Sequence, residues 1–364
     1  MHTNFHQWYE CSSEKYYNLW QIYEQHQQHL IDGTKHIEYV IEPELIEVLK
    51  NFKKPKTDRK YIQSLIVDSL KKIRKRYNKV RLLYSGGTDS YTILKTAIDN
   101  NIYIDETITH MVSMEDNAKV NIEYLPGLKY AKLHTPNRIG KVTVISPVID
   151  DLKYYFNDDW YLDKSVVKGS PLWLRGQYVC RYMPKAEQGT ITLTGYEKPQ
   201  VINQSGQLYW SIPDNPMSEY MEVDSIYHFF CDKNNPELLV SQLYAFIDNI
   251  KTFGNLHNNI DSFGTNKRLD LINKLGYYST GRPYLDKAFI GKQTFYTSLK
   301  NRLFIKELIK LGHQSIVDLI TDTHKKIFLK YYNIPHGLEY MHGFVEPVSR
   351  FSQKIAIYQD SMGS

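Results

Sequence analysis

The sequence Tyr84-Ser85-Gly86-Gly87-Thr88-Asp89-Ser90 joins a short β-prone run to a helical pattern. Before it, residues 79–84 are rich in Val, Leu and Tyr, as is typical of a buried strand. After it, apolar residues recur at helical spacing from Tyr91 to Ile98. Two adjacent glycines let the backbone approach a ligand closely, because neither carries a Cβ atom. The stretch therefore predicts a strand, a tight loop and a helix in succession.

The start of this predicted helix is suited to binding phosphate. A helix N-terminus carries partial positive charge and N–H groups without intrahelical partners. We expect the amides of Gly87, Thr88 and Asp89 to point outward, with the hydroxyls of Ser85 and Ser90 as further donors. Asp89 is an acid beside the expected phosphates, so we interpret it as a Mg²⁺ ligand. The structural alternative is a glycine turn with a Ser/Asp helix cap.

The order Ser-Gly-Gly-x-Asp-Ser resembles the pyrophosphate-loop signature of the N-type ATP pyrophosphatases. This family includes the synthetase domain of asparagine synthetases and several RNA-modifying enzymes. The resemblance covers about residues 78–200. It implies an α/β fold with a doubly wound, mainly parallel sheet of the adenine nucleotide alpha hydrolase type, which is Rossmann-like, and here with helical N- and C-terminal additions. It also implies that ATP is split into AMP and pyrophosphate, and that the nucleotide phosphates are bound by Ser85, Gly86, Gly87, Thr88, Asp89 and Ser90. The chain contains neither Gly-x4-Gly-Lys-Ser/Thr nor Gly-x-Gly-x-x-Gly.

The same resemblance assigns roles at the ends of two other strands. The end of the second strand passes along the adenine in this family, which corresponds to Met111, Val112 and Ser113 here. A Gly/Asp/Glu turn after the fourth strand faces the pyrophosphate loop in the asparagine synthetase-like group. The turn at that position here is residues 195–199, Gly-Tyr-Glu-Lys-Pro, in place of the usual Gly-x-Gly-Ala-Asp-Glu.

From this turn we expect Gly195 beside the nucleotide and Glu197 as a second Mg²⁺ ligand. Lys198 is a candidate catalytic residue that balances the charge of the leaving pyrophosphate. Arg175 is another, as a clamp for the α-phosphate or for a substrate carboxylate. The alternative for the turn is a plain β-turn, and its position after a strand is what favours a functional role.

Several functions are compatible with these residues. The first is a ligase of the carbon–nitrogen-forming class, which uses ATP and Mg²⁺ to adenylate a carboxylate or amide oxygen of a small-molecule substrate. Residues 1–50 are too few for a glutaminase domain and have His2 instead of its cysteine nucleophile, so the nucleophile is free ammonia, an amine, or ammonia from a partner. The second is modification of a tRNA or DNA base. A reductase related to the sulfonucleotide enzymes is less favoured, because the last cysteine is Cys231.

The length of 364 residues is typical of about two domains. We predict a mainly helical region 1–77, an ATP-binding domain 78–235 and a helical region 236–364. The sequence shows no signal peptide and no apolar run near the ~18 residues of a membrane span, so a cytoplasmic protein is expected. Three widely spaced cysteines indicate neither a zinc knuckle nor a disulfide framework. Thirty tyrosines with many Lys, Asn and Ile are typical of an AT-rich genome, such as that of a phage.

The net charge of +5 is unevenly distributed. Residues 51–81 contain twelve Lys or Arg and two Asp, a net charge of +10, so the remainder of the chain carries −5. One interpretation is a surface that binds nucleic acid. The other is the solvated side of an amphipathic helix, because the charges alternate with an apolar stripe formed by Ile62, Leu65, Ile66, Leu70 and Ile73.

The order of predicted elements is that of an α/β domain. Strands are expected at residues 79–84, 106–114, 141–146 and 190–194. Helices are expected at 61–77 and 90–100, before 132 with a break at Pro126-Gly127, and over 149–182. A hairpin is predicted around Ser205-Gly206, and further helices at 236–252, 266–275, 296–311 and 315–332. Residues 1–50 are expected to be helical in pieces, with a strand, a turn and a helix around Pro43.

Overall fold

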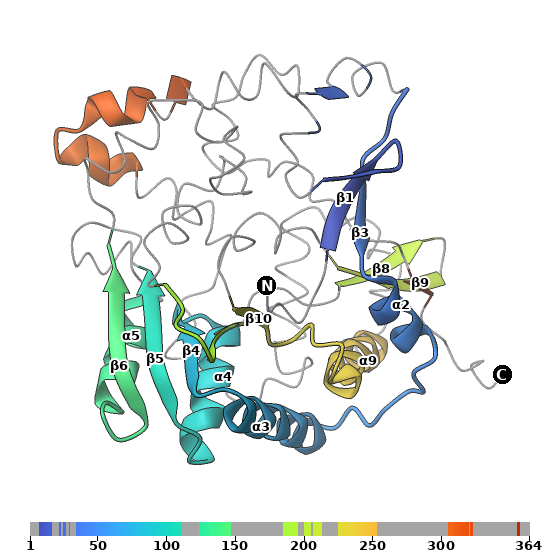
Figure 1. Cartoon of the computed structure of the whole chain (residues 1–364), viewed down its shortest axis with the longest axis horizontal. Coiled ribbons are helices and arrows are strands. Elements are labelled where there is room, and N and C mark those ends of the chain that lie inside the picture. Colours follow the sequence, from blue (N-terminus) through green and yellow to red (C-terminus); the bar gives the residue numbers. More distant parts are fainter. Residues whose placement is uncertain are drawn as a thin grey trace.

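A five-stranded parallel sheet forms the centre of the protein (Figure 1). The computed structural model describes residues 7–16, 22, 25, 26, 29, 34–110, 124–146, 185–195, 200–204, 207–212, 225–252, 305–319, 321–322 and 355–356. The sheet has the order β10-β7-β4-β5-β6, with strands β4 (Lys79–Leu83), β5 (Ile104–His110), β6 (Ile139–Ile145), β7 (Thr190–Thr194) and β10 (Ile226–His228). Helices connect and flank these strands, so the domain is an α/β, Rossmann-like fold.

The strand order reverses at β4. β5 pairs with β4 on one side, and β6 pairs with β5. The next strand in the chain, β7, pairs with β4 on its other side. All four strand pairs of this sheet are parallel. The carboxyl ends of β4 and β7 therefore meet at a topological switch point, where ligands bind in open α/β sheets.

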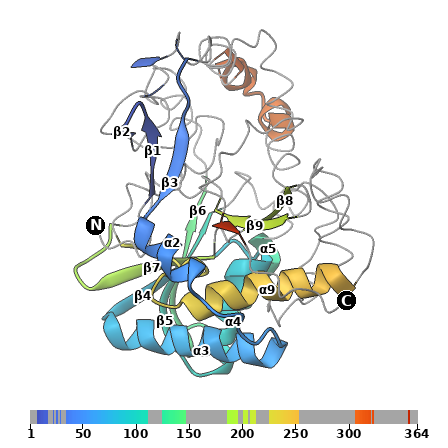
Figure 2. The same ribbon diagram turned by 90° about the vertical axis from the view of Figure 1, so that its right-hand side faces the viewer.

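Four helices share one hydrophobic core with the sheet. They are α3 (Arg59–Arg76), α4 (Thr88–Asp99), α5 (Tyr124–Leu133) and α9 (Pro236–Thr252). Figure 2 shows α3, α4 and α9 side by side. Helix α3 begins where the Asp58 carboxylate accepts a hydrogen bond from the Tyr61 amide at 2.9 Å. The shared core includes Ile66, Leu70, Leu82, Leu94, Leu193 and Leu238.

Two smaller antiparallel sheets complete the described structure. The first has the order β2-β1-β3, with β1 (Gln7–Cys11), β2 (Glu14–Tyr16) and β3 (Glu38–Ile41), and leads into α2 (Pro43–Lys50). The second has the order β11-β9-β8, with β8 (Gln200–Gln204), β9 (Gln207–Ser211) and β11 (Ile355–Ala356). The ammonium group of Lys233, just before α9, lies 2.6 Å from Glu42 and 3.2 Å from Glu44, which ties the N-terminal region to the α/β domain.

Most of the predicted elements in the α/β domain are confirmed. The strands at 79–84, 106–114, 141–146 and 190–194 correspond to β4–β7, with ends that shift by up to four residues. The hairpin around residues 205–206 and the helix at 236–252 are also present. The residues 149–182 and 266–275, for which helices were predicted, lie outside the described part of the chain. Helices α3 and α9 pack into the α/β core, although the sequence division assigned them to the flanking regions.

Two expectations are wrong, and one strand was not predicted. Residues 7–16 form strands instead of a helix, because their aromatic residues pair across strands and the chain reverses at Ser12 and Ser13, whose φ angles are 55° and 68°. Helix α5 runs through Pro126 without a break, since that proline lies in the first turn, where an amide hydrogen is not needed. The strand β10 was not predicted, as three residues give too little periodicity.

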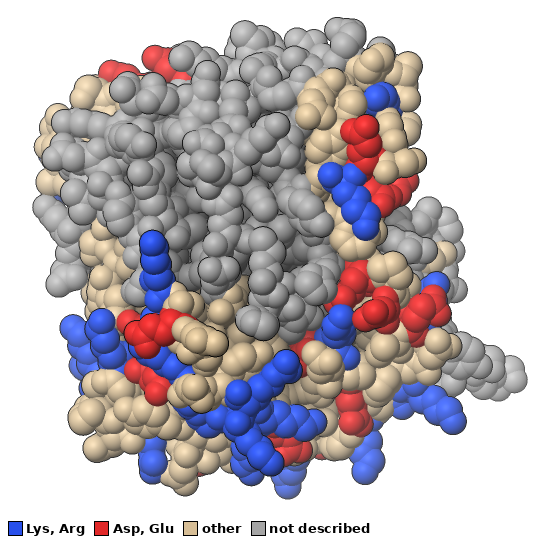
Figure 3. Space-filling model, viewed as in Figure 1, with Lys and Arg blue, Asp and Glu red and all other residues tan. Residues whose placement is uncertain are grey.

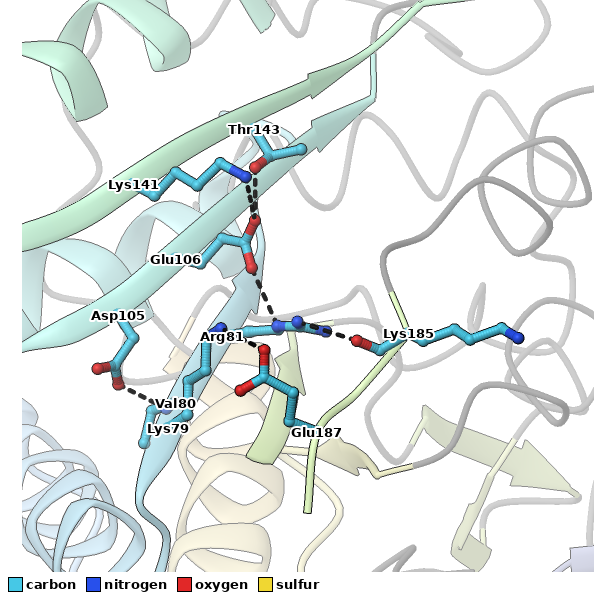
Figure 4. Close-up of polar contacts among 9 residues, drawn as sticks. All are labelled: Lys79, Val80, Arg81, Asp105, Glu106, Lys141, Thr143, Lys185 and Glu187. Atoms are coloured by element: carbon cyan, nitrogen blue, oxygen red, sulfur yellow. Dashed lines mark hydrogen bonds and ion pairs between the residues drawn. The ribbon is translucent and has the colours of Figure 1, made fainter. Parts of the chain in front are cut away.

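A buried ion pair joins β4 and β5 on the face of the sheet opposite Val80 and Leu82 (Figure 4). Arg81 and Glu106 are each 3% exposed, and Nε of the arginine lies 3.0 Å from the carboxylate. Arg81 also donates to the Lys185 carbonyl at 3.1 Å, and Glu106 accepts from the Thr143 hydroxyl. Each charge is thus held by several partners, as buried charges require.

We predict that Glu106→Gln lowers the free energy of unfolding by about 3 kcal/mol, because the substitution leaves the buried arginine without a countercharge. Urea unfolding followed by circular dichroism measures this loss. Asp99→Asn is the matched control: Asp99 pairs with Lys95 at 3.0 Å on the partly exposed surface of α4, so its loss should change stability by less than about 1 kcal/mol. Equal stability of the two variants would contradict the prediction.

His228 in β10 gives a second prediction. Burial lowers the pKa of its imidazole to about 4. In the unfolded chain a histidine takes up a proton near pH 6.5, while the folded protein keeps His228 neutral. Stability should therefore fall as the pH is lowered from 6.5 towards 4, by up to about 3 kcal/mol. His228→Gln should flatten this dependence in urea titrations at several pH values.

Candidate functional site

The predicted glycine loop lies at the switch point of the sheet. It leaves β4 at its carboxyl end and leads directly into α4. Gly195 follows β7, the neighbouring strand on the other side of the reversal. The structure thus brings together two of the segments that the sequence assigned to one site, residues 85–90 and Gly195.

The loop turns sharply at Gly86. Its φ angle of 75° lies in the left-handed region, which glycine adopts without the steric strain that a Cβ atom causes. The preceding residue, Tyr84, is 1% exposed, and its amide donates to the Ile108 carbonyl of β5 at 2.8 Å. Burial raises the pKa of the Tyr84 phenol well above its usual value, so this side chain is a neutral support beneath the turn.

Two serine hydroxyls close the loop on itself. The Ser85 hydroxyl accepts a hydrogen bond from the Gly87 amide at 3.2 Å. The Ser90 hydroxyl accepts from the Ser85 amide, donates to the Gly87 carbonyl, and lies 3.2 Å from the Ser85 hydroxyl. Both hydroxyls therefore stabilise the shape of the turn. Their use as donors to a ligand stays a prediction.

Helix α4 begins at Thr88, with Gly87 as its N-cap. The cap makes no side-chain hydrogen bond to the first turn, because glycine has no side chain. The amides of a first helical turn lack intrahelical partners, and the helix dipole concentrates positive charge there. Asp89 in this turn is favourable for the dipole even without a ligand. The helix start can nevertheless receive an anion along its axis.

Two glycines from other elements press against the loop. A methyl group at Gly127 of α5 would lie 2.6 Å from the Gly86 Cα atom and 3.3 Å from the Tyr84 ring. A methyl group at Gly195 would lie 2.9 Å from the Asp89 carbonyl carbon and 3.0 Å from the Ser90 nitrogen. The 2.6 Å and 2.9 Å distances are shorter than real Cβ contacts allow, so only glycine fits at either position with the loop in this conformation.

Gly127 was missed as a site residue in the sequence. The only indication in the sequence is a glycine inside a helical pattern. Glycine at such a position destabilises the helix by about 1 kcal/mol relative to alanine, so close packing is the usual reason for its presence. The structure supplies that reason, namely the approach of α5 to the loop.

The packing buries part of the loop and leaves part of it accessible. Gly86 and Gly87 are buried, whereas Ser85 and Asp89 are partly exposed. A ligand approaching from solvent would therefore meet the loop at the Ser85 and Asp89 positions.

Met111, Val112, Ser113, Arg175, Glu197 and Lys198 lie outside the described residues. Strand β5 ends at His110, so the segment predicted for adenine begins directly after a strand of the sheet. These assignments stay predictions.

Asp89 is the acidic group of the loop itself, and the predicted second carboxylate is Glu197. Within the described ranges, no three His, Cys, Asp or Glu side chains come together in a metal-binding cluster. Such a cluster is not what a nucleotide-bound Mg²⁺ needs, since the ion is usually held by one or two carboxylates, water and the phosphates. The donor at Asp89 fits that kind of coordination.

No protein-family model matches the chain, and no curated protein is detectably similar to it. Within the described residues, no helix has the length and apolar character needed to cross a membrane.

The close contact at Gly127 predicts that Gly127→Ala destabilises the protein. At an exposed helical position the same substitution raises the free energy of unfolding by up to about 1 kcal/mol. Here the added methyl group would overlap Gly86, so we expect a loss of about 1–3 kcal/mol. Urea unfolding measures the difference, and Lys132→Ala at an exposed site of α5 serves as the control. A stabilised Gly127→Ala protein would show that the loop and α5 do not pack in this way.

Proposed function

We propose that this chain is an ATP-dependent adenylating enzyme of the N-type ATP pyrophosphatase superfamily, with the fold of the adenine nucleotide alpha hydrolases. It would act as a carbon–nitrogen ligase similar to the synthetase domain of asparagine synthetases. One observation carries the proposal: the sequence Ser-Gly-Gly-Thr-Asp-Ser forms a left-handed glycine turn ahead of a glycine-capped helix, at the switch point of a parallel sheet.

The reaction begins with an oxygen that is a poor leaving group. A carboxylate or amide oxygen of the substrate attacks the α-phosphorus of ATP, a new oxygen–phosphorus bond forms, and the bond from the α-phosphorus to the bridging oxygen breaks. Pyrophosphate departs with that oxygen. An amine or ammonia then attacks the activated carbon, and AMP leaves with the oxygen that it had bound.

The protein's part in this reaction is to hold the pyrophosphate portion still. The amides at the start of α4 and the turn at Gly86 form the cradle, and the Ser85–Ser90 hydrogen bonds keep the turn in shape before ATP arrives. A preformed cradle is valuable because no reorganisation is then needed during the reaction. Lys198 and Arg175 are the proposed cations for the charge that builds at the α-phosphorus.

Asp89 and Glu197 are the residues proposed to hold Mg²⁺. The ion, when bound, neutralises the phosphates and makes pyrophosphate a better leaving group. Asp89 lies in the first turn of α4, at the partly exposed side of the loop, where a carboxylate can reach a phosphate-bound ion.

The test identifies the products of ATP cleavage and measures how the rate of their formation depends on Asp89. With ATP labelled at the α-phosphate, Mg²⁺ and a panel of amino acids, amines, tRNA and DNA, we expect AMP and pyrophosphate to form. Asp89→Asn should reduce the rate at least about 100-fold, because it removes the charge that holds the ion. Its free energy of unfolding should fall by no more than about 1 kcal/mol, the usual strength of a charge–dipole interaction. Asp99→Asn, at the other end of α4, should retain the rate. Release of ADP and phosphate, or full activity in Asp89→Asn, would contradict the proposal.

A further inference from the structure

Helix α3 and the segment before it carry a strongly basic surface. Eight Lys and Arg side chains of this region are exposed, and we call them the α3 basic surface: Lys53, Lys54, Lys56, Lys60, Lys71, Lys72, Lys75 and Arg76. Figure 3 shows Lys and Arg side chains gathered over α3 on one face of the molecule. Three further basic residues nearby pair with acids, Arg74 with Asp105, Lys79 with Glu187 and Arg81 with Glu106.

The positions of these charges follow from the amphipathic helix. The apolar stripe of α3 is buried in the core, so its opposite side faces solvent. Lys71 and Lys75, and likewise Lys72 and Arg76, are four residues apart and therefore neighbours on that side. Lys60 lies eleven residues before Lys71, which is three turns along the same stripe. The exposed cations of α3 therefore form two groups, Lys60 in the first turn and Lys71, Lys72, Lys75 and Arg76 in the last two turns. From the first to the last of them the helix rises about 24 Å.

The stability of α3 does not explain why its exposed side carries these cations. Lys75 and Arg76 lie in the last turn, where cations favour the helix dipole. Lys60 lies in the first turn, which contains no acidic residue, and Lys53 and Lys56 precede it. Positive charge at a helix N-terminus opposes the dipole. Like charges four residues apart also repel by a few tenths of a kcal/mol per pair.

Other lysines of this protein are placed differently. Lys50 lies 2.9 Å from Glu47, Lys95 lies 3.0 Å from Asp99, and Lys233 contacts two glutamates. A helix side that is merely solvated usually alternates charges of opposite sign in this way. On the exposed side of α3 the single acid between residues 60 and 76 is Asp68. The α3 basic surface is therefore strongly positive, with Asp68 as the one acid between Lys60 and Arg76.

We propose that the α3 basic surface docks a nucleic-acid duplex through its phosphate backbone. Phosphates of a duplex repeat at short, regular intervals along its axis, and the two groups of cations, spread over about 24 Å of helix, would face about seven base pairs. Seven of the eight side chains are lysines, which bind phosphate as flexible point charges and carry no sequence information. The surface therefore serves affinity and orientation, not base recognition.

Two other polyanions fit the surface less well. Single strands bind to proteins with open aromatic platforms, whereas Tyr61 and Tyr77 are partly buried and the Tyr61 hydroxyl bonds to Glu237. Acidic proteins usually meet an interface with an apolar or aromatic centre and few lysines. Within residues 53–76, no large apolar side chain is exposed.

The surface lies away from the glycine loop. The C-terminal end of α3 joins β4 at the amino end of that strand, while the loop lies at the carboxyl end. β4 is five residues long, so its ends are about 17 Å apart. A docked duplex would therefore be held beside the ATP-binding domain without occupying the loop.

The test is a titration of the full-length protein, without ATP, into fluorescein-labelled duplexes of about 20 base pairs, roughly three times the length that the cations of α3 would face. Fluorescence anisotropy gives the affinity between about 50 and 200 mM KCl. We expect the logarithm of the binding constant to fall with the logarithm of the salt concentration with a slope of about −5 to −7. Parallel DNA and RNA duplexes of one sequence show which of the two is bound more tightly.

Lys71→Gln/Lys72→Gln/Lys75→Gln should weaken binding at least about tenfold and reduce the steepness of the slope by about 3, because up to three phosphate contacts are lost. The control Lys129→Gln/Lys306→Gln/Lys310→Gln removes the same charge from exposed positions outside the surface. Lys53→Gln/Lys56→Gln/Lys60→Gln is a second test variant, which keeps the cations in the last two turns of α3 unchanged. Circular dichroism checks the fold of each variant.

Equal affinity of the test and control variants would overturn the proposal, as would wild-type binding with no salt dependence. Displacement of the duplex by poly-glutamate as readily as by unlabelled duplex would assign the surface to an acidic protein instead. The proposal is independent of the proposed reaction, because Asp89→Asn should bind the duplex like the wild-type protein. Loss of ATP chemistry and loss of duplex binding are thereby separated.

Discussion

The close approach of three backbone segments around Gly86 is the constraint on which the rest of this structure depends. The turn after β4, helix α5 and the end of β7 meet so tightly that neither Gly127 nor Gly195 has room for a methyl group. The left-handed φ of Gly86 and the hydrogen bonds between Ser85 and Ser90 fix the turn from within. A short polar loop is thus made rigid at the point where a parallel sheet offers its binding site.

The two faces of the sheet perform different tasks around this loop. One face carries Val80 and Leu82 and packs with α3, α4 and α9 into the main core. The other face carries the Arg81–Glu106 ion pair, which fixes the pairing of β4 with β5 beneath the loop. A mispaired strand would leave these charges buried without partners, so the pair favours one register over its alternatives. The loop is therefore held on a strand whose position is set from both sides.

Much of this arrangement could be predicted from the sequence, for a physical reason. The strand at 190–194 and the helix near 61–77 have strong local periodicity, and the glycine loop has a composition that few other structures require. The strands in residues 7–16 were missed because an aromatic-rich run fits both helix and strand, and tertiary pairing decides between them. The contact of Gly127 with Gly86 joins residues 41 positions apart in the sequence and follows from packing that no local pattern encodes. Arg175, Glu197 and Lys198 stay predictions that rest on the family resemblance.

The central claim is that this loop binds the outer phosphates of ATP. The NMR signal of one backbone amide, that of Gly87, tests it. Gly87 is the only glycine that follows another glycine in this sequence, so labelling glycine with ¹⁵N and carbonyl ¹³C isolates its amide signal in a carbonyl-filtered NMR spectrum. A phosphate-gripping loop predicts that MgATP and Mg-pyrophosphate shift this signal to saturation, while AMP leaves it nearly unchanged. A Gly87 signal that does not respond to MgATP, in protein that is otherwise folded, would contradict the claim.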